Sequence, residues 1–251
     1  MWLLNPYRFG TALDTDAAAY IAAVEAADGQ ALEAGVRTAI NAFVVGCKAD
    51  GIWNAIKASC IMAGARTLNG ALVPLVGTAP TNFNFVSSDY NRKTGLVGDG
   101  STKYLNSGRL SDADPQDNCH LAVFATTAGN SVTGYVGGST NFTKRISSGS
   151  TRLNFGTNFS ISPAAPSLVA ASRSASASYL VRNSNTSFTA TASSSTPGSV
   201  LMAVFAVNSN GTIQVHTNAR LAFYSIGEAL DLALLDARVT TLITAFAAAI
   251  P

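Results

Sequence analysis

The sequence predicts a mainly β protein: an antiparallel β-sandwich preceded by N-terminal helices and followed by one C-terminal helix. Three observations lead to this class. Residues 15–61 carry apolar side chains at helical spacing, the chain from about Ala79 to about Glu228 alternates with a period of two in short segments, and residues 231–251 return to helical spacing. Many short strands separated by turn residues are typical of a sandwich or barrel and not of a parallel α/β sheet.

Three helices are expected in the N-terminal third of the chain. The first begins at Thr15 and ends at Asp28-Gly29, the second covers residues 30–48, and a shorter third covers residues 52–61. Each has apolar residues at spacings of three and four, which is typical of a helix with one buried face. These residues are Tyr20, Ile21, Val24 and Ala27, then Leu32, Val36, Ile40, Phe43, Val44 and Cys47, then Ile52, Trp53, Ile56, Cys60 and Ile61.

The region after Pro74 is expected to form short strands joined by turns. Turn signals occur at Gly98-Asp99-Gly100, Asn183-Ser184-Asn185, Pro197-Gly198 and Asn210-Gly211. The strands are predicted over residues 82–86, 94–97, 102–106, 120–126, 133–136, 152–155, 168–172, 178–182, 186–191, 200–207 and 220–224.

A last helix is expected after Asp231, whose carboxylate suits an N-cap. Its apolar face comprises Leu235, Val239, Leu242, Ile243 and Phe246, and it should cover an edge or a face of the sandwich. The chain therefore divides into residues 1–75, a leader with a helical attachment region, and residues 76–251, the sandwich with its terminal helix.

Composition excludes several classes of protein. Of 251 residues, 12% are charged and 47% are hydrophobic, yet no apolar run reaches the roughly 18 residues of a membrane-spanning helix. The first residues lack the basic start and cleavage site of a signal peptide, so export by that route is not expected. The three cysteines Cys47, Cys60 and Cys119 form no C-x-x-C pair, which favours buried thiols in a reducing cytoplasm over disulfides or a zinc site.

The distribution of charge argues against nucleic-acid binding and against acid/base chemistry in the β region. No acidic residue occurs between Asp117 and Glu228, and the six cations there are too dispersed for a nucleic-acid-binding stripe. These cations are Lys144, Arg145, Arg152, Arg173, Arg182 and Arg220. For Arg92, Lys93, Lys144 and Arg145 a solvated surface charge is the default interpretation, and contact with an acidic neighbour or a polysaccharide is the alternative.

Three segments resemble the concanavalin A-like, LamG-type jelly rolls. The run GLVGDGSTKYL from Gly95 to Leu105 is similar to the early strand pair of that family. The run SYLVRNSN from Ser178 to Asn185 resembles its hairpin, and RLAFYSIGEAL from Arg220 to Leu230 resembles its closing strand before a terminal helix. The resemblance implies a concanavalin A-like jelly roll over roughly residues 80 to 250.

A second resemblance concerns structural proteins of tailed bacteriophages and prophages. It is carried by WLLNPYRF at residues 2–9 and ADGIWNAI at residues 49–56, since leaders and helices of this kind precede a LamG-like sandwich there. The likeness implies a virion protein of the tail, fibre, baseplate or capsid surface, assembled in the host cytoplasm. It also implies partners among other virion proteins, homo-oligomerisation, and host-surface glycans as a further partner.

The sequence contains no catalytic constellation. A glycosidase needs two carboxylates across the sugar site, but the only Glu residues are Glu25, Glu33 and Glu228, and no E-x-D-x-x-E run occurs. A hydrolase would need folding to pair carboxylates from Asp99, Asp112 or Glu228. His120 and His216 have no nucleophile motif, since Ser225-Ile-Gly227 is only a fragment of one.

One acidic cluster, Asp112, Asp114 and Asp117, offers oxygens that Ca²⁺ would accept. It fails the EF-hand pattern at the glycine and at the final glutamate, so a solvated turn shaped by Pro115 is preferred and Ca²⁺ is a minor alternative. No other cofactor is expected.

Candidate binding residues are aromatic or apolar. The leader residues Trp2, Leu3, Leu4, Tyr7 and Phe9 need cover from the protein's own core or from a neighbouring subunit, and they are candidate assembly residues. Tyr90, Tyr135 and Phe142 are candidate glycan contacts. We therefore expect a non-enzymatic virion structural protein, with a carbohydrate- or receptor-binding module as the alternative and a glycoside hydrolase as a less favoured third.

Overall fold

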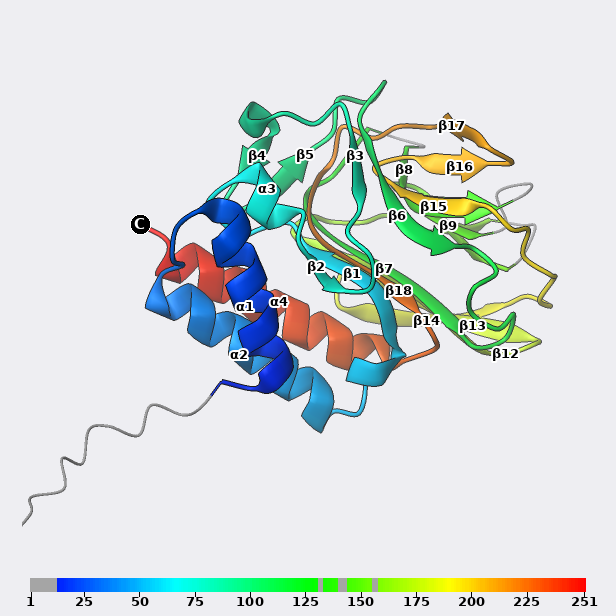
Figure 1. The fold of residues 1–251 in the computed structure, drawn as a ribbon. Coiled ribbons are helices and arrows are strands. Elements are labelled where there is room, and N and C mark those ends of the chain that lie inside the picture. Colours follow the sequence, from blue (N-terminus) through cyan, green and yellow to red (C-terminus); the bar gives the residue numbers. More distant parts are fainter. Residues whose placement is uncertain (1–12, 131–132, 140–143, 155–157) are drawn as a thin grey trace, which may run out of the picture.

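The protein is built of three layers: a layer of helices, a first β-sheet and a second β-sheet (Figure 1). The computed structural model describes residues 13–130, 133–139, 144–154 and 158–251. The two sheets form an antiparallel, jelly-roll-like β-sandwich, and the helices cover the outer face of the first sheet. The expected fold class is confirmed.

The first sheet is central in the molecule. Its main path has the order β14-β13-β12-β7-β18-β1-β2, all antiparallel, and β5 joins it by pairing with β18 and β4. The strands are β1 (Ile56–Ile61), β2 (Pro74–Val76), β4 (Tyr90–Asn91), β5 (Gly95–Val97), β7 (Cys119–Thr127), β12 (Ser167–Ala175), β13 (Ser178–Asn183), β14 (Thr186–Thr191) and β18 (Arg220–Gly227).

The second sheet lies on the side of the first sheet away from the helices. Its main path has the order β11-β10-β9-β8-β15-β6-β3, and a short hairpin, β16 with β17, attaches to β8. The strands are β3 (Thr81–Phe83), β6 (Tyr104–Leu110), β8 (Gly134–Ser139), β9 (Lys144–Ser147), β10 (Ser150–Leu153), β11 (Phe159–Ser160), β15 (Leu201–Val204), β16 (Val207–Ser209) and β17 (Thr212–Gln214).

The first sheet is buried on both of its faces. Along β7, Ala122 and Phe124 pack toward the helices, whereas Leu121, Val123 and Ala125 pack toward the second sheet. This alternation follows from the period of two in a strand. It explains the uninterrupted apolar runs Leu121–Ala125 in β7 and Leu168–Ala171 in β12, since both sets of alternating side chains face a core.

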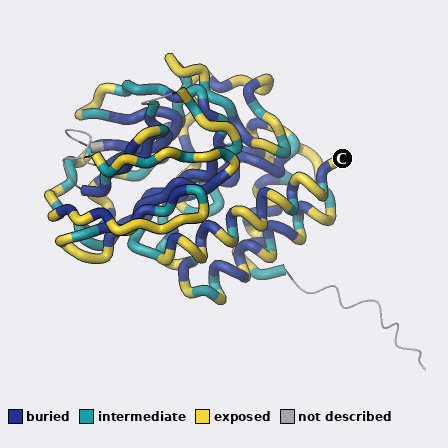
Figure 2. Tube along the Cα trace, turned by 180° about the vertical axis from the view of Figure 1, so that it is seen from behind, coloured by how far each residue is buried: buried dark blue, intermediate teal, exposed yellow. Residues whose placement is uncertain are grey.

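The helical layer consists of α1 (Thr15–Asp28), α2 (Ala34–Ala49) and α4 (Leu232–Ala249), with the short α3 (Leu68–Ala71) beside α1. Asp14 caps α1 by accepting a hydrogen bond from the Asp16 amide, and Asp231 caps α4 through the amides of Ala233 and Leu234. The helices bury one side and expose the other (Figure 2). The first, second and last expected helices and the Asp231 cap are confirmed.

The expected third helix over residues 52–61 is wrong. A short 3-10 turn at Trp53–Ala55 leads into strand β1, which pairs with β18 and β2. Ile56 and Ile61 face the helices, while Ala58 and Cys60 face the second sheet. A short apolar run buried on two faces cannot be assigned to helix or strand by periodicity alone, and here pairing with β18 decides.

The helical layer draws on both ends of the chain. Side chains of α1, α2 and α4 share one hydrophobic core with the outer face of the first sheet. β1, which precedes residue 76, is a strand of that same sheet. Within the described residues, α4 is the one helix that by length and composition would suffice to cross a bilayer, a property that apolar core helices share.

Candidate functional site

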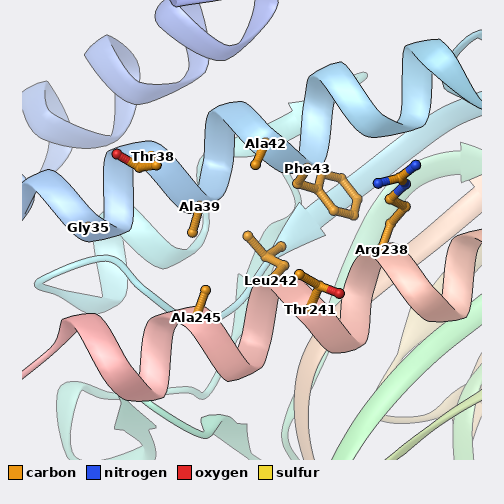
Figure 3. Close-up of a pocket in the computed structure, with 9 residues that line it drawn as sticks. All are labelled: Gly35, Thr38, Ala39, Ala42, Phe43, Arg238, Thr241, Leu242 and Ala245. Atoms are coloured by element: carbon orange, nitrogen blue, oxygen red, sulfur yellow. The ribbon is translucent and has the colours of Figure 1, made fainter. Parts of the chain in front are cut away.

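An apolar groove lies between α2 and α4 on the outer side of the helical layer (Figure 3). It has a cavity volume of about 340 Å³, within the range of ligand and peptide sites. The side chains that line it are small or apolar, apart from two threonine hydroxyls and one arginine. They belong to Gly35, Thr38, Ala39, Ala42, Phe43, Arg238, Thr241, Leu242 and Ala245.

The groove is closed at both ends. Near the first turn of α2 the helices touch, because a Cβ placed on Gly35 would lie only 2.7 Å from the Cβ of Ala249. At the other end, Arg238 of α4 makes two hydrogen bonds of 2.7 and 2.8 Å with the carboxylate of Asp50, just after α2. Between these two contacts the side chains of α2 and α4 are mostly small, so they do not fill the space between the helices.

The groove lies next to the point at which residues 1–12 join the described chain. Leu13 lines a neighbouring hollow together with Leu32, Ala34, Arg37 and Thr38, and Thr38 also lines the groove. The candidate assembly residues Trp2, Leu3, Leu4, Tyr7 and Phe9 lie outside the described residues. The sequence identified the apolar leader but not the groove, because the groove depends on how α4 packs beside α2.

A second hollow lies on the outer face of the second sheet. Phe83 and Tyr104 stack at 4.3 Å between ring centroids, and the ring of His216 meets Tyr104 edge-on at 6.1 Å. Tyr104 also lines a cleft of about 170 Å³ with the amides of Asn106 and Asn208. We call this the outer-sheet cleft, and its other lining residues are Leu201, Met202, Ala203, Gly211 and Ile213.

The expected glycan contacts do not meet in this cleft. Tyr135 is fully buried between the sheets, and its hydroxyl accepts a hydrogen bond from the Gly129 amide. That burial contradicts a role in sugar contact. Tyr90 is half-buried and donates to the Ala65 carbonyl at 2.8 Å, and Phe142 lies outside the described residues. The sequence missed Phe83 and Tyr104 because an outward-facing aromatic pair appears only once β3 is paired with β6.

The acidic cluster considered for Ca²⁺ is dispersed. Asp114 is buried and forms a two-pronged ion pair with the guanidinium of Arg109, while Asp112 is exposed. Within the described part of the chain, no three His, Cys, Asp or Glu side chains are grouped so that they would hold a metal ion.

The carboxylates considered for hydrolysis have separate partners. Glu228 pairs with Lys57 at 3.1 Å, and Asp99 accepts hydrogen bonds from the amides of Ser101, Thr102 and Lys103 at the turn after β5. No hydrogen bond or ion pair joins Asp99, Asp112 and Glu228 to one another among the residues that the structure describes.

The structure does bring His120 together with Ser225. The serine hydroxyl donates to Nε2 at 2.8 Å, and Nδ1 donates to the Glu228 carbonyl at 2.6 Å, which fixes the neutral tautomer. Both residues are fully buried between β7 and β18, and burial lowers the pKa of His120 to about 4. The contact between Ser225 and His120 has the geometry of a nucleophile and its general base. However, a backbone carbonyl orients the histidine in place of a carboxylate, and solvent does not reach either side chain.

Two cations expected at the surface are buried instead. Lys144 is fully buried and donates to the Ser111 carbonyl at 2.9 Å, and Arg145 is nearly buried. Their interpretation as solvated charges is therefore wrong. A backbone carbonyl bonds Lys144, and the Ser150 hydroxyl and the Asn158 side-chain carbonyl bond Arg145, so these partners of the two cations are neutral groups that charge patterns in the sequence do not reveal.

Comparisons with known proteins yield only distant likenesses. No protein-family model matches the chain, and no curated protein matches it significantly. A crystal structure of the NanB sialidase from Streptococcus pneumoniae is similar at 15% identity and TM-score 0.37, covering 51% of this chain and 24% of that one. A Trypanosoma rangeli sialidase mutant displaying trans-sialidase activity is similar at 9% identity and TM-score 0.43, covering 82% of this chain and 39% of that one. The chain thus spans well under half of these sialidases, and likenesses this weak carry no argument about function.

Proposed function

We propose that this protein is a non-enzymatic structural subunit of a tailed-phage or prophage virion, in the tail, fibre, baseplate or capsid surface. It acts by assembly with other virion proteins and with copies of itself. The observation that carries this proposal is the open apolar groove on the helical layer, beside the attachment point of an apolar leader.

The groove has the character of a docking surface. Apolar side chains that remain open to solvent on a folded subunit mark sites of association, because covering them removes apolar area from water. Ala42 in the groove is exposed, and Leu234 in the first turn of α4 is 37% exposed. The helical layer would thus be the attachment side, and the second sheet would face outward.

Sedimentation velocity over a range of concentrations tests the assembly proposal. We expect the full chain to self-associate, and we expect Ala42→Glu to shift it to monomer because a charge would then enter the groove. Ala22→Glu is the matched control, since Ala22 is an exposed alanine of α1 outside the groove. A chain that stays monomeric and binds no other virion protein would contradict the proposal.

The outer-sheet cleft favours a second function, the binding of a carbohydrate or other receptor. Aromatic rings beside amide side chains are the usual means of recognising sugars, because the ring covers the apolar face and the amides bond hydroxyls. Here Tyr104, Asn106 and Asn208 line one cleft. A glycan array should show binding that Tyr104→Ala abolishes and Tyr90→Phe preserves. Absence of binding across the array would contradict this second function and leave assembly as the one proposed function.

A further inference from the structure

The position at which the leader joins the described chain is fixed by contacts with α2. Lys48, near the end of α2, lies 2.7 and 2.6 Å from the carboxylates of Asp14 and Asp16, and the amide of Asp14 donates to Asn41 at 2.7 Å. Leu13 then lines the hollow at the first turn of α2. The leader therefore joins the described chain near the beginning of α2.

This point lies at the end of the groove that is nearer the first turn of α2. Gly35 and Ala249 are in contact there, and the open part extends the other way, toward Phe43 and Arg238. Leu13, which joins the leader to the described chain, therefore lies beside the closed end and not beside the open part, which favours the groove of another copy as the binding site of the leader.

The leader is long enough to reach the groove of another molecule, and it matches that groove in chemistry. Twelve extended residues span at most about 40 Å, whereas the groove from Gly35 to Phe43 is about 12 Å long at helical rise. The leader carries Trp2, Leu3, Leu4, Tyr7 and Phe9 with Arg8 as its one charged side chain. It is therefore long enough to bridge two molecules and apolar enough to be stabilised by burial.

We propose that apolar side chains from residues 2–9 of one copy enter the groove between α2 and α4 of a second copy. This inference rests on the proposed function and deepens it, because it names the partner of the attachment side. Every copy has one leader and one groove, so the contact either closes as a reciprocal exchange between two copies or extends head-to-tail into a ring or a filament.

Disulfide cross-linking between two variants tests the pairing. One copy carries Arg8→Cys, which spares the apolar leader residues, and the other carries Ala42→Cys in the groove. The native thiols do not compete, because Cys47, Cys60 and Cys119 are buried, and burial raises the pKa of Cys47 to about 12. We expect several-fold more cross-linked dimer from this mixture than from Arg8→Cys mixed with the control Ala22→Cys.

Trp2 offers a second measurement that needs no cross-link. The chain has two tryptophans, Trp2 and Trp53, so Trp53→Phe leaves Trp2 as the only indole reporter. Its emission should shift to the blue and become protected from acrylamide as concentration rises. Ala42→Glu should remove the shift.

The outcomes separate the two proposals. A chain that associates without the cross-link or the Trp2 shift retains the assembly function but overturns the leader contact. A cross-linked monomer, formed at high dilution by a chain carrying both cysteines, shows that the leader occupies its own groove and also overturns the contact. A chain that remains monomeric at all concentrations overturns the leader contact, and it overturns the assembly function as well if it also binds no other virion protein.

Discussion

The hydroxyl of Ser225 donates to Nε2 of His120 at 2.8 Å, in a fully buried contact between neighbouring strands of the first sheet. The other ring nitrogen donates to the Glu228 carbonyl, and burial of the ring favours its neutral form. This arrangement links β7, β18 and the segment that leads into α4. It also makes the stability of the fold depend on pH.

The free energy of unfolding should fall as the pH falls from about 6.5 to about 4. Burial lowers the pKa of His120 from the ordinary 6.5 to about 4, so the unfolded chain takes up a proton before the folded one does. The stabilisation is complete above pH 6.5, and its loss across this window amounts to about 3 kcal/mol. Urea unfolding at a series of pH values measures it. His120→Gln should flatten this slope, and an unchanged slope in that variant would contradict the assignment.

Arg173→Met should lower the free energy of unfolding by about 3 kcal/mol or more, since it leaves buried carbonyls without a donor. The guanidinium is fully buried and lies 5.1 Å from the centre of the Tyr179 ring. Its Nε and Nη1 donate to the carbonyls of Leu153, Ala175, Ser176, Ser178 and Ala192.

Chemical denaturation provides the comparison for Arg173. Arg37→Met is the control, because Arg37 is 42% exposed and makes a 3.7 Å ion pair with Glu25. Its effect should remain below about 1 kcal/mol. Equal effects for the two variants would show that the carbonyl cage around Arg173 is unimportant.

The ion pair between Arg182 and Asp236 should stabilise the docking of α4 on β13. The two groups lie 2.8 Å apart, and the Asp236 side chain is only 2% exposed. A double-mutant cycle with Arg182→Ala and Asp236→Ala should give a coupling energy of about 1–3 kcal/mol. The exposed Arg37 and Glu25 pair should give less than about 1 kcal/mol. A coupling energy of zero in this cycle would show that the ion pair does not stabilise the docking of α4.

Gly95→Ala should destabilise the fold by roughly 2 kcal/mol or more, as a strained backbone and a clash act together. Gly95 has a φ of 98°, and a Cβ there would lie 2.2 Å from the carbonyl oxygen of Leu221 in the paired strand β18. Gly149→Ala is the matched control, because a Cβ at Gly149 meets nothing within 4 Å. Thermal unfolding of the two variants should therefore differ by several degrees, and similar midpoints would contradict the crowding at Gly95.

Local signals in the sequence predicted much of the secondary structure. The stop at Asp28-Gly29 and the cap at Asp231 both occur where the helices end and begin. Strands such as β13 and β14 were recognised within a residue of their bounds, because their alternation and the turn at residues 183–185 are local properties.

Features that depend on the third dimension were not predictable. β1 contributes side chains to both hydrophobic cores, so its apolar spacing indicated a helix until its pairing with β18 was known. The burial of Lys144 and Arg173 depends on carbonyls that are distant in the sequence. The groove between α2 and α4 likewise requires helices from opposite ends of the chain to meet.

The two-sided burial of β7 restricts which changes in length this chain tolerates. Because Leu121 and Val123 face one core and Ala122 and Phe124 the other, deletion of one residue would exchange the two sets. Phe124 would then enter the space fitted to a smaller side chain, and two hydrophobic cores would be mispacked by a single event. Natural variation in this strand should therefore consist of substitutions, while insertions and deletions should concentrate in the loops between strands.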